Sequence, residues 1–378
     1  MSSWYCQMPF KHVYVDSTGL SPCCQIPRRN TTLDQWHTND FLLKLQQQHL
    51  SGQPSPSCQQ CYHSEKQYGQ SLRTEANRDY TDQVFTETQI DFVDFRSINI
   101  CNFKCRSCNP VFSNGIAQES NRNPDLQKFY YVDQLPKTLA VDSANTDWIL
   151  DHLPSLKRVM FTGGEPTYIP EVRYIIERIR QHYPHIQIII TSNASFQDKF
   201  WLDISQDLNV HWTLSIDAVG PRASIIRHGS DWSRVQQNVI RLCETANSVS
   251  INSVITCLSL FGLAPLLKFV REMQHRSRPP YGRHGDQGCR HQFYVCEKPY
   301  YLAATNWPES IQPRALSYVK NCLDLDLDQE QRDQICNLAR SIETNEFDQQ
   351  VWDSGLLYNQ ILDRIRNEDH TTLFQPQV

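Results

Sequence analysis

Three cysteines on one short stretch are the residues of this chain best suited to chemistry. Cys101, Cys105 and Cys108 are separated by three and then two residues. Closely spaced cysteine thiolates hold iron–sulfur clusters, and a 4Fe–4S cube usually takes four of them. Three thiolates from one loop can bind one face of such a cube and leave one iron without a protein ligand. That iron could then hold a small chelating molecule.

A structural zinc site is the alternative for these cysteines. Zinc prefers four ligands, commonly as paired Cys-x-x-Cys units, and this loop supplies three. A second motif, Gly163-Gly164-Glu165-Pro166, favours the iron–sulfur interpretation. The two glycines let a ligand approach the backbone closely, and the Glu165 carboxylate could accept hydrogen bonds from an ammonium group. Glu165 could also be an acid at a helix N-terminus, which the following Pro166 favours.

Together, the two motifs resemble those of the radical S-adenosylmethionine (SAM) superfamily. In that family Cys-x-x-x-Cys-x-x-Cys binds a 4Fe–4S cluster, and Gly-Gly-Glu-Pro after the second barrel strand contacts the methionine amino group of SAM. The resemblance implies that an electron from the reduced cluster breaks a carbon–sulfur bond of SAM. The resulting 5′-deoxyadenosyl radical would abstract a substrate hydrogen. The chain departs from the family pattern at Ser107, where an aromatic residue often lies beside the adenine.

Five other polar residues are candidates for binding SAM. Ser215 and Asp217 stand two residues apart at the end of a predicted strand, so their side chains share a face. They resemble the family's contacts to the SAM ribose or carboxylate, although Asp217 could instead cap the following helix. Arg227 resembles the arginine that pairs with the SAM carboxylate, and its alternative is a surface arginine. The last two candidates, Asn193 and Asn252, lie on the ends of other predicted strands.

A second group of four cysteines lies near the N-terminus: Cys6, Cys24, Cys58 and Cys61. They could bind a second 4Fe–4S cluster entirely through protein ligands, or a structural zinc ion. Their layout resembles the auxiliary-cluster module (SPASM or twitch) of radical SAM enzymes. By that resemblance, the four residues between Gly19 and Cys24 make Cys24, not Cys23, the ligand. The module usually follows the barrel, whereas here it precedes it.

The predicted elements place the cysteine loop after a strand. Residues 92–100 alternate apolar and polar side chains, as a half-buried strand does. Strands alternating with helical segments predict right-handed βαβ units and a parallel sheet. The predicted fold class is therefore α/β, a partial (β/α)6 TIM-like barrel with its site at the carboxyl ends of the strands. The other predicted strands are 157–161, 187–193, 210–217, 249–256 and 291–296.

Three domains are predicted along the chain. A small α+β auxiliary iron–sulfur domain of the SPASM or twitch type covers residues 1–80, with a β-hairpin before Cys23 and a helix within 33–50. The radical SAM partial barrel covers residues 81–310. A helical C-terminal region covers residues 311–378.

Composition limits the class of protein and its partners. Of 378 residues, 39% are hydrophobic and 20% charged, which is ordinary for a soluble globular protein. A net charge of −5 gives no basic field to recruit nucleic acid or an anionic membrane. No apolar run approaches the roughly 20 residues that span a bilayer, and the first residues show no signal-peptide pattern. We expect a cytoplasmic protein with neither nucleic acid nor membrane as a partner, and a solvated loop in the basic tract 276–291.

The expected function is that of a radical SAM enzyme acting on a ribosomally made peptide, by crosslinking, epimerisation, excision or oxidation. A peptide is expected because the auxiliary-cluster branch that the chain resembles is rich in peptide-modifying enzymes. A small peptide-presenting protein and an external electron donor, such as a flavodoxin or ferredoxin, are the expected partners. The alternatives are a radical SAM dehydrogenase of a small carbohydrate-like substrate, a non-catalytic iron–sulfur electron carrier and a zinc-stabilised binding module.

Overall fold

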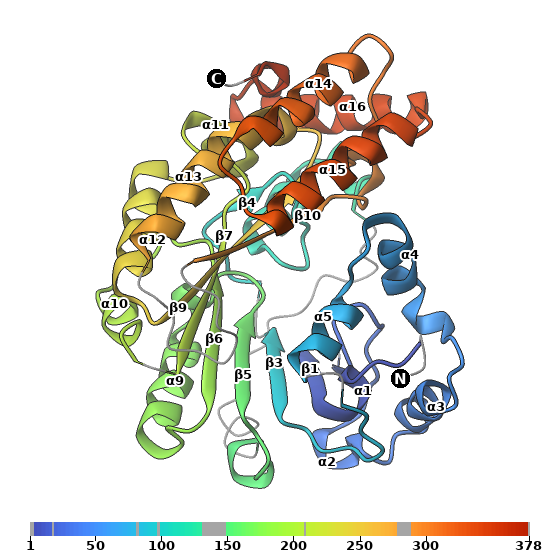
Figure 1. Cartoon of the computed structure of the whole chain (residues 1–378). Coiled ribbons are helices and arrows are strands. Elements are labelled where there is room, and N and C mark those ends of the chain that lie inside the picture. The colour runs from blue at the N-terminus through green and yellow to red at the C-terminus, as the bar shows by residue number, and fades with distance from the viewer. Residues whose placement is uncertain are drawn as a thin grey trace. The chain divides into compact units, whose positions relative to one another are not determined.

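The computed structural model describes most of the chain (Figure 1). The described residues are 4–16, 19–80, 83–96, 99–130, 149–207, 209–277 and 289–376. Much of the basic tract 276–291 therefore lies outside them. Residues 112–152 form a polar segment that the sequence predicts to be helix-like, and part of it also lies outside the described residues. In these ranges, no helix has both the length and the hydropathy needed to cross a membrane.

A sheet of eight strands forms the centre of the fold, in the order β10-β9-β7-β6-β5-β3-β1-β2 (Figure 1). The pairs β3–β5, β7–β9 and β9–β10 are parallel. This arrangement confirms the predicted α/β class with a parallel sheet. Six of its strands correspond to the six predicted ones: β3 (Phe92–Arg96), β5 (Arg158–Thr162), β6 (Gln187–Ser192), β7 (Val210–Ser215), β9 (Ser248–Ile255) and β10 (Arg290–Val295).

The predicted N-terminal hairpin joins this sheet. β1 (His12–Asp16) pairs antiparallel with β2 (Gly19–Ser21) and parallel with β3. Val13 of β1 lies opposite Val93 of β3, and neither side chain has exposed surface. The hairpin thus continues the parallel sheet, because burying its apolar face requires a neighbouring strand.

Two compact units divide the chain: residues 1–98 with 136–189, and residues 99–135 with 190–378. These limits differ from the predicted domains 1–80, 81–310 and 311–378, which remain a prediction about folding units. The difference arises because β1 pairs with β3, so the N-terminal residues share a sheet with the first strands of the predicted barrel.

Short helices surround the strands of the first unit. The predicted helix within 33–50 is two helices, because Asn39 caps the second by accepting hydrogen bonds from the backbone N–H groups of Phe41 and Leu42. The longest helix, α9, buries apolar side chains at helical spacing. The helices are α1 (Met8–Lys11), α2 (Leu33–Trp36), α3 (Asp40–Leu50), η1 (Pro56–Cys58), α4 (Gln59–Tyr68), α5 (Leu72–Asp79), η2 (Pro166–Tyr168) and α9 (Pro170–His182).

The second unit contains longer helices and a small second sheet. Its α-helices are α6 (Asn114–Arg122), α7 (Pro124–Gln127), α10 (Phe200–Ile204), α11 (Pro221–Ile226), α12 (Trp232–Thr245), α13 (Leu263–Arg276), α14 (Gln312–Asn321), α15 (Gln329–Thr344) and α16 (Gln349–Arg366). Short 3-10 helices are η3 (Leu260–Gly262), η4 (Tyr300–Leu302), η5 (Cys322–Asp324) and η6 (His370–Phe374). The small sheet pairs β4 (Lys104–Cys105) with β8 (Arg227–His228). The last three α-helices agree with the helical character predicted for residues 311–378.

Asp94 is a buried carboxyl group on β3. Thr162 Oγ1 of β5 donates a hydrogen bond to its Oδ1 at 2.9 Å. Burial raises the pKa of Asp94 to about 6, although Arg96 and the Thr162 hydrogen bond act in the opposite direction. The folded protein therefore holds this proton more tightly than the unfolded chain does. Between about pH 4 and pH 6, the stability contributed by this group falls as the pH rises.

We expect Asp94→Asn to remove this part of the pH dependence. For wild type, Asp94 should lower the free energy of unfolding by up to about 3 kcal/mol between pH 4 and pH 7, since one pKa unit corresponds to about 1.4 kcal/mol. Denaturant unfolding of both metal-free proteins at pH 4, 5, 6 and 7 measures the difference. A difference that does not change with pH would contradict the assignment.

Candidate functional site

The three-cysteine loop follows β3 in the chain and belongs to the second unit. Cys101, Cys105 and Cys108 are all half-buried, whereas most other cysteines of the chain are fully buried. The backbone N–H of Phe103 points at Cys101 Sγ, with an N–S distance of 3.4 Å. Partly exposed thiols that also receive backbone N–H groups suit a cluster, because such hydrogen bonds tune its potential. The residues present therefore fit an iron–sulfur group.

Pairing of β4 with β8 holds the middle cysteine in place. Cys105 lies opposite Arg227, and Lys104 opposite His228. The turn after β8 packs closely on the loop, since a Cβ on Gly229 would lie 2.9 Å from the carbonyl oxygen of Asn102. Gly229 also has a φ of +95°, which other residues rarely adopt. A larger residue at this position would push the loop away.

Arg227 places a positive charge beside the cysteines. It neighbours Cys105 and Cys101, and its guanidinium lies 5.9 Å from the centre of the Phe103 ring. Burial raises the pKa of the Cys105 thiol, and the Arg227 charge opposes this rise. The arginine thus favours the thiolate, which is the form that binds metal. The alternative of a surface arginine does not hold, because its side chain is only 14% exposed.

Asp217 is the ion-pair partner of Arg227. Arg227 Nη1 donates to Asp217 Oδ2 at 2.8 Å, and the backbone N–H of Val254 donates to Oδ1 at 2.9 Å. Asp217 does not cap the next helix, because α11 begins after Gly220 without a side-chain cap. The sequence therefore identified two residues that the fold brings into direct contact.

Two buried polar atoms near this pair have no hydrogen-bond partner within the described residues. They are Arg227 Nε and Asn252 Oδ1. Asn252 lies opposite Ser215 in the register of β9 and β7, and Ser215 is half-buried at the end of its strand. Buried polar atoms are normally paired. A polar ligand such as SAM could supply the missing partners.

Asn193 supports the cysteine loop. Its Nδ2 donates to Asn102 Oδ1 at 2.9 Å, and Asn102 Nδ2 donates to Ser195 Oγ at 2.8 Å. Asn193 Oδ1 accepts from the backbone N–H of Ser195 at 3.0 Å. The sequence marked Asn193 as a SAM contact and missed Asn102 and Ser195. No spacing rule connects positions so far apart in the chain.

The Gly-Gly-Glu-Pro motif follows β5 in the first unit. Gly163 has a φ of +93°, which glycine adopts without strain. Glu165 is 1% exposed and caps η2, accepting from the Thr167 backbone N–H at 3.3 Å and from Thr167 Oγ1 at 2.7 Å. Its predicted role at a helix N-terminus is therefore confirmed, and its contact with SAM remains a prediction.

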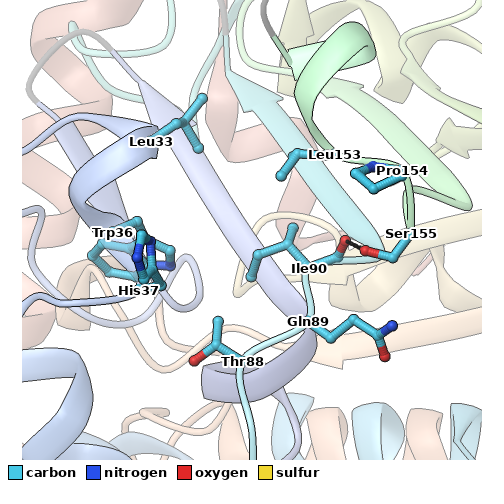
Figure 2. A pocket seen from close by; sticks show the side chains of 9 residues that line it. All are labelled: Leu33, Trp36, His37, Thr88, Gln89, Ile90, Leu153, Pro154 and Ser155. Atoms are coloured by element: carbon cyan, nitrogen blue, oxygen red, sulfur yellow. Dashed lines mark hydrogen bonds between the residues drawn. The ribbon is translucent and has the colours of Figure 1, made fainter.

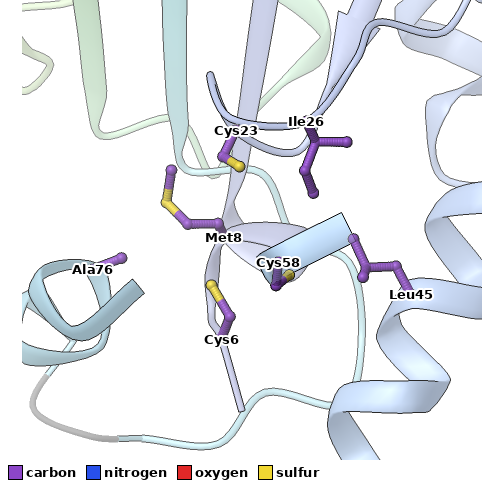
Figure 3. Close-up of a cluster of buried hydrophobic side chains, with 7 residues drawn as sticks. All are labelled: Cys6, Met8, Cys23, Ile26, Leu45, Cys58 and Ala76. Carbon is purple, nitrogen blue, oxygen red and sulfur yellow. The ribbon is translucent and has the colours of Figure 1, made fainter. Parts of the chain in front are cut away.

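Cys6, Cys23, Cys58 and Cys61 line a narrow cavity in the first unit. Figure 3 shows the first three of these cysteines close together beside Met8. The volume is about 20 Å³, room for roughly one water molecule. A 4Fe–4S cube would require the thiols to move outward, whereas one ion requires less space. Within the described ranges, no group of three or more His, Cys, Asp or Glu side chains is arranged to hold a single metal ion.

Cys24 lies outside this cavity. It is exposed, whereas Cys23 is 8% exposed and lines the cavity. The chain turns at these two residues. The carbonyl of Cys23 accepts hydrogen bonds from Ser21 Oγ at 2.7 Å and from the Ile26 backbone N–H at 3.3 Å. The structure thus brings Cys23, instead of the predicted Cys24, to the other three cysteines.

His49 and Arg73 also line the cavity, and the sequence did not mark them. His49 Nδ1 lies 2.7 Å from the carbonyl oxygen of Trp4, which places the proton on Nδ1 and leaves Nε2 facing Cys58 Sγ at 3.8 Å. Arg73 donates to the Tyr5 carbonyl at 2.9 Å and forms an ion pair with Glu65. Both side chains are nearly fully buried beside the thiols.

Comparison with known proteins identifies the central part of the chain. Residues 95–263 match the family model described as the Radical SAM superfamily. They form a radical SAM domain. The matched segment contains the cysteine loop, the Gly-Gly-Glu-Pro motif, Asn193, and the Asp217–Arg227 pair. No curated protein matches the chain by sequence.

Solved structures resemble the chain only distantly. "Native anSMEcpe with bound AdoMet" has 16% identity over 62% of this chain and 59% of its own, with a TM-score of 0.41. Streptococcus suis SuiB bound to precursor peptide SuiA has 15% identity over 77% and 60%, with a TM-score of 0.42. TYW1 with a lysine-pyruvate adduct has 14% identity over 71% and 84%, with a TM-score of 0.34. The chain thus spans about three fifths of the first two proteins.

A wider cavity, of about 520 Å³, lies in the first unit (Figure 2). Its lining includes Ile90, just before β3, and Ser155, shortly before β5, and Ser155 Oγ donates to the Ile90 carbonyl at 2.8 Å. It therefore lies at the amino ends of these strands. Parallel α/β enzymes place their chemistry at the carboxyl ends. The cavity is not part of the candidate site.

The placement of the N-terminal cysteines predicts different outcomes for two neighbouring substitutions. Cys23→Ala should lose the metal bound at the N-terminal group, because Cys23 is one of the four cysteines that line the cavity. Cys24→Ala should retain it and serves as the matched control. Iron and zinc content per chain after anaerobic reconstitution measures both. If only Cys24→Ala lost the metal, Cys24 would be the ligand, as its spacing from Gly19 implies.

Proposed function

We propose that this chain is a radical SAM enzyme that binds a 4Fe–4S cluster through Cys101, Cys105 and Cys108. The observation that carries the proposal is the set of three half-buried thiols on one loop of the matched segment, with Arg227 opposite Cys105. When bound, the cluster would supply the electron that cleaves SAM and yields a radical able to abstract a substrate hydrogen. The protein would bind, orient and shield the reactants.

We infer separate roles for the polar residues of the domain. Asn193 holds the cysteine loop through Asn102. Asp217 holds Arg227, whose Nε has no hydrogen-bond partner within the described residues and could donate to a carboxylate. Ser215 lies opposite Asn252, where ribose hydroxyls could bind. Gly163, Gly164, Glu165 and Pro166 would bind the methionine amino group, as the family resemblance implies.

We also propose a second metal centre on Cys6, Cys23, Cys58 and Cys61. Its resemblance to an auxiliary 4Fe–4S module supports a cluster. The alternative is a single zinc ion, as in a zinc-stabilised module, and its binding would require these thiols to move closer together. In either case Arg73 would offset part of the charge of four thiolates, since it lines the same cavity.

A ribosomally made peptide is the substrate that we propose, on the basis of the auxiliary-cluster resemblance. Crosslinking, epimerisation, excision and oxidation are the reactions considered, and a small carbohydrate-like substrate is the alternative. A peptide-presenting protein and a flavodoxin or ferredoxin would be the partners, in the cytoplasm. An electron carrier is disfavoured because such a protein does not need a Gly-Gly-Glu-Pro motif.

Reductive cleavage of SAM tests the function directly. Anaerobically reconstituted wild type, given a strong reductant, should form 5′-deoxyadenosine even without substrate. Combined Cys101→Ala, Cys105→Ala and Cys108→Ala substitutions should abolish the product and remove about four irons per chain. Chromatography and iron analysis measure the two results. A confirmed, reduced cluster that yields no 5′-deoxyadenosine, with or without candidate peptides, would favour the electron carrier.

Glu165→Ala tests the SAM-binding motif separately from the cluster. We expect SAM binding to weaken by about 1.5–3 kcal/mol, because a charge-assisted hydrogen bond is lost. The iron content should not change, since Glu165 is not a ligand. Equilibrium binding of SAM to the reconstituted protein gives the affinity, and Glu165→Gln tests whether the charge is needed. Unchanged SAM affinity in Glu165→Ala would limit this residue to its capping role.

A further inference from the structure

We propose that the C-terminal helix α16 belongs to the cluster site and that Arg106 is the positioning residue that couples them. This inference rests on the proposed function, in which the three-cysteine loop binds a 4Fe–4S cluster. Two residues flank Cys105 in the loop, Lys104 and Arg106. Arg106 forms ion pairs with a residue of α16 and with one just after it. Lys104 is connected to α16 through Glu119.

Arg106 makes the more extensive connection. Its side chain has no exposed surface. Nη1 donates to Asn359 Oδ1 at 2.9 Å, and Nη2 forms ion pairs with Asp363 and, at 2.7 Å, with Glu368. The hydroxyl of Tyr358 donates to the Arg106 backbone carbonyl at 2.8 Å. Four residues within a segment of eleven therefore hold both the backbone and the side chain of Arg106.

Lys104 makes a second connection on the other side of Cys105. Lys104 Nζ lies 2.8 Å from Glu119 Oε1, and Arg366 Nη2 of α16 lies 2.6 Å from Glu119 Oε2. Glu119 and Arg366 are almost completely buried, with side chains 4% and 1% exposed. His228, opposite Lys104 in the small sheet, also pairs with Glu368.

These contacts have a direct consequence for Cys105. On one side of this residue, Tyr358 of α16 holds the Arg106 backbone. On the other side, the Lys104 side chain pairs with Glu119 of α6, which pairs in turn with Arg366 of α16. Arg227 lies opposite Cys105 in β8. A ligand-bearing loop that folding has already ordered binds its metal more tightly, because less conformational freedom is lost on binding. A fully buried guanidinium without its carboxylates would be strongly unfavourable, so loop and helix keep their relative position together.

The test compares two substitutions that break the connection from opposite sides. Arg106→Gln changes the loop, and Asp363→Asn changes α16 while leaving the loop sequence intact. In both, iron at the three-cysteine loop should be lost to a chelator about tenfold faster or more, as is typical when partners of metal ligands are removed. The electron paramagnetic resonance spectrum of the reduced cluster with SAM should also change. Arg364→Gln is the control for Arg106→Gln, because Arg364 is exposed on α16 and both substitutions remove one positive charge.

The contrary result is a pair of folded variants whose iron site behaves like that of wild type. If Arg106→Gln and Asp363→Asn keep wild-type helix content by circular dichroism, wild-type iron loss and an unchanged resonance spectrum, the inference is overturned. If Arg106→Gln does not fold, Asp363→Asn and Arg106→Lys decide the question in the same measurements. Wild type that binds no iron at the loop would overturn the proposed function itself, whereas failure of the inference alone leaves wild-type iron and SAM cleavage intact.

Discussion

A two-residue backbone pairing organises the candidate centre. β4 and β8 are short, yet they set Cys105 opposite Arg227 and Lys104 opposite His228. The pairing makes a cation the neighbour of the thiols and brings Asp217, the partner of that cation, to the same place. The loop keeps its conformation because each charge drawn into this region has a partner.

Buried charge explains why so much of the second unit converges on one loop. Arg106 is fully buried, so it needs carboxylates, and the chain supplies them from residues more than 250 positions later. Asn102, Asn193 and Ser195 satisfy one another through side-chain hydrogen bonds on the other side of the loop. These contacts cost nothing further when a ligand binds, because folding has already ordered them.

The cysteines that line the cavity of the first unit are more deeply buried than those of the three-cysteine loop. Cys6, Cys23 and Cys58 are part of an apolar cluster with Leu45 and Ile26, and burial raises the pKa of all three thiols. A metal there would have to displace protons from sulfur atoms that the fold keeps neutral in its absence. The three thiols of the cysteine loop are half-buried and lie near a cation, so they are more accessible to metal.

The sequence by itself determined the class of sheet, six of its strands and the two motifs of the radical SAM domain, because periodicity and close spacing are local properties. It also identified Asp217 and Arg227 as candidate site residues, but not the ion pair between them. Only the tertiary structure decided that Cys23 turns inward and Cys24 outward, because one turn separates neighbouring residues. Only it joined β1 to β3, Asn193 to Asn102 and Arg106 to α16. Each of these contacts links distant positions whose pairing depends on burial and register, which no local pattern records.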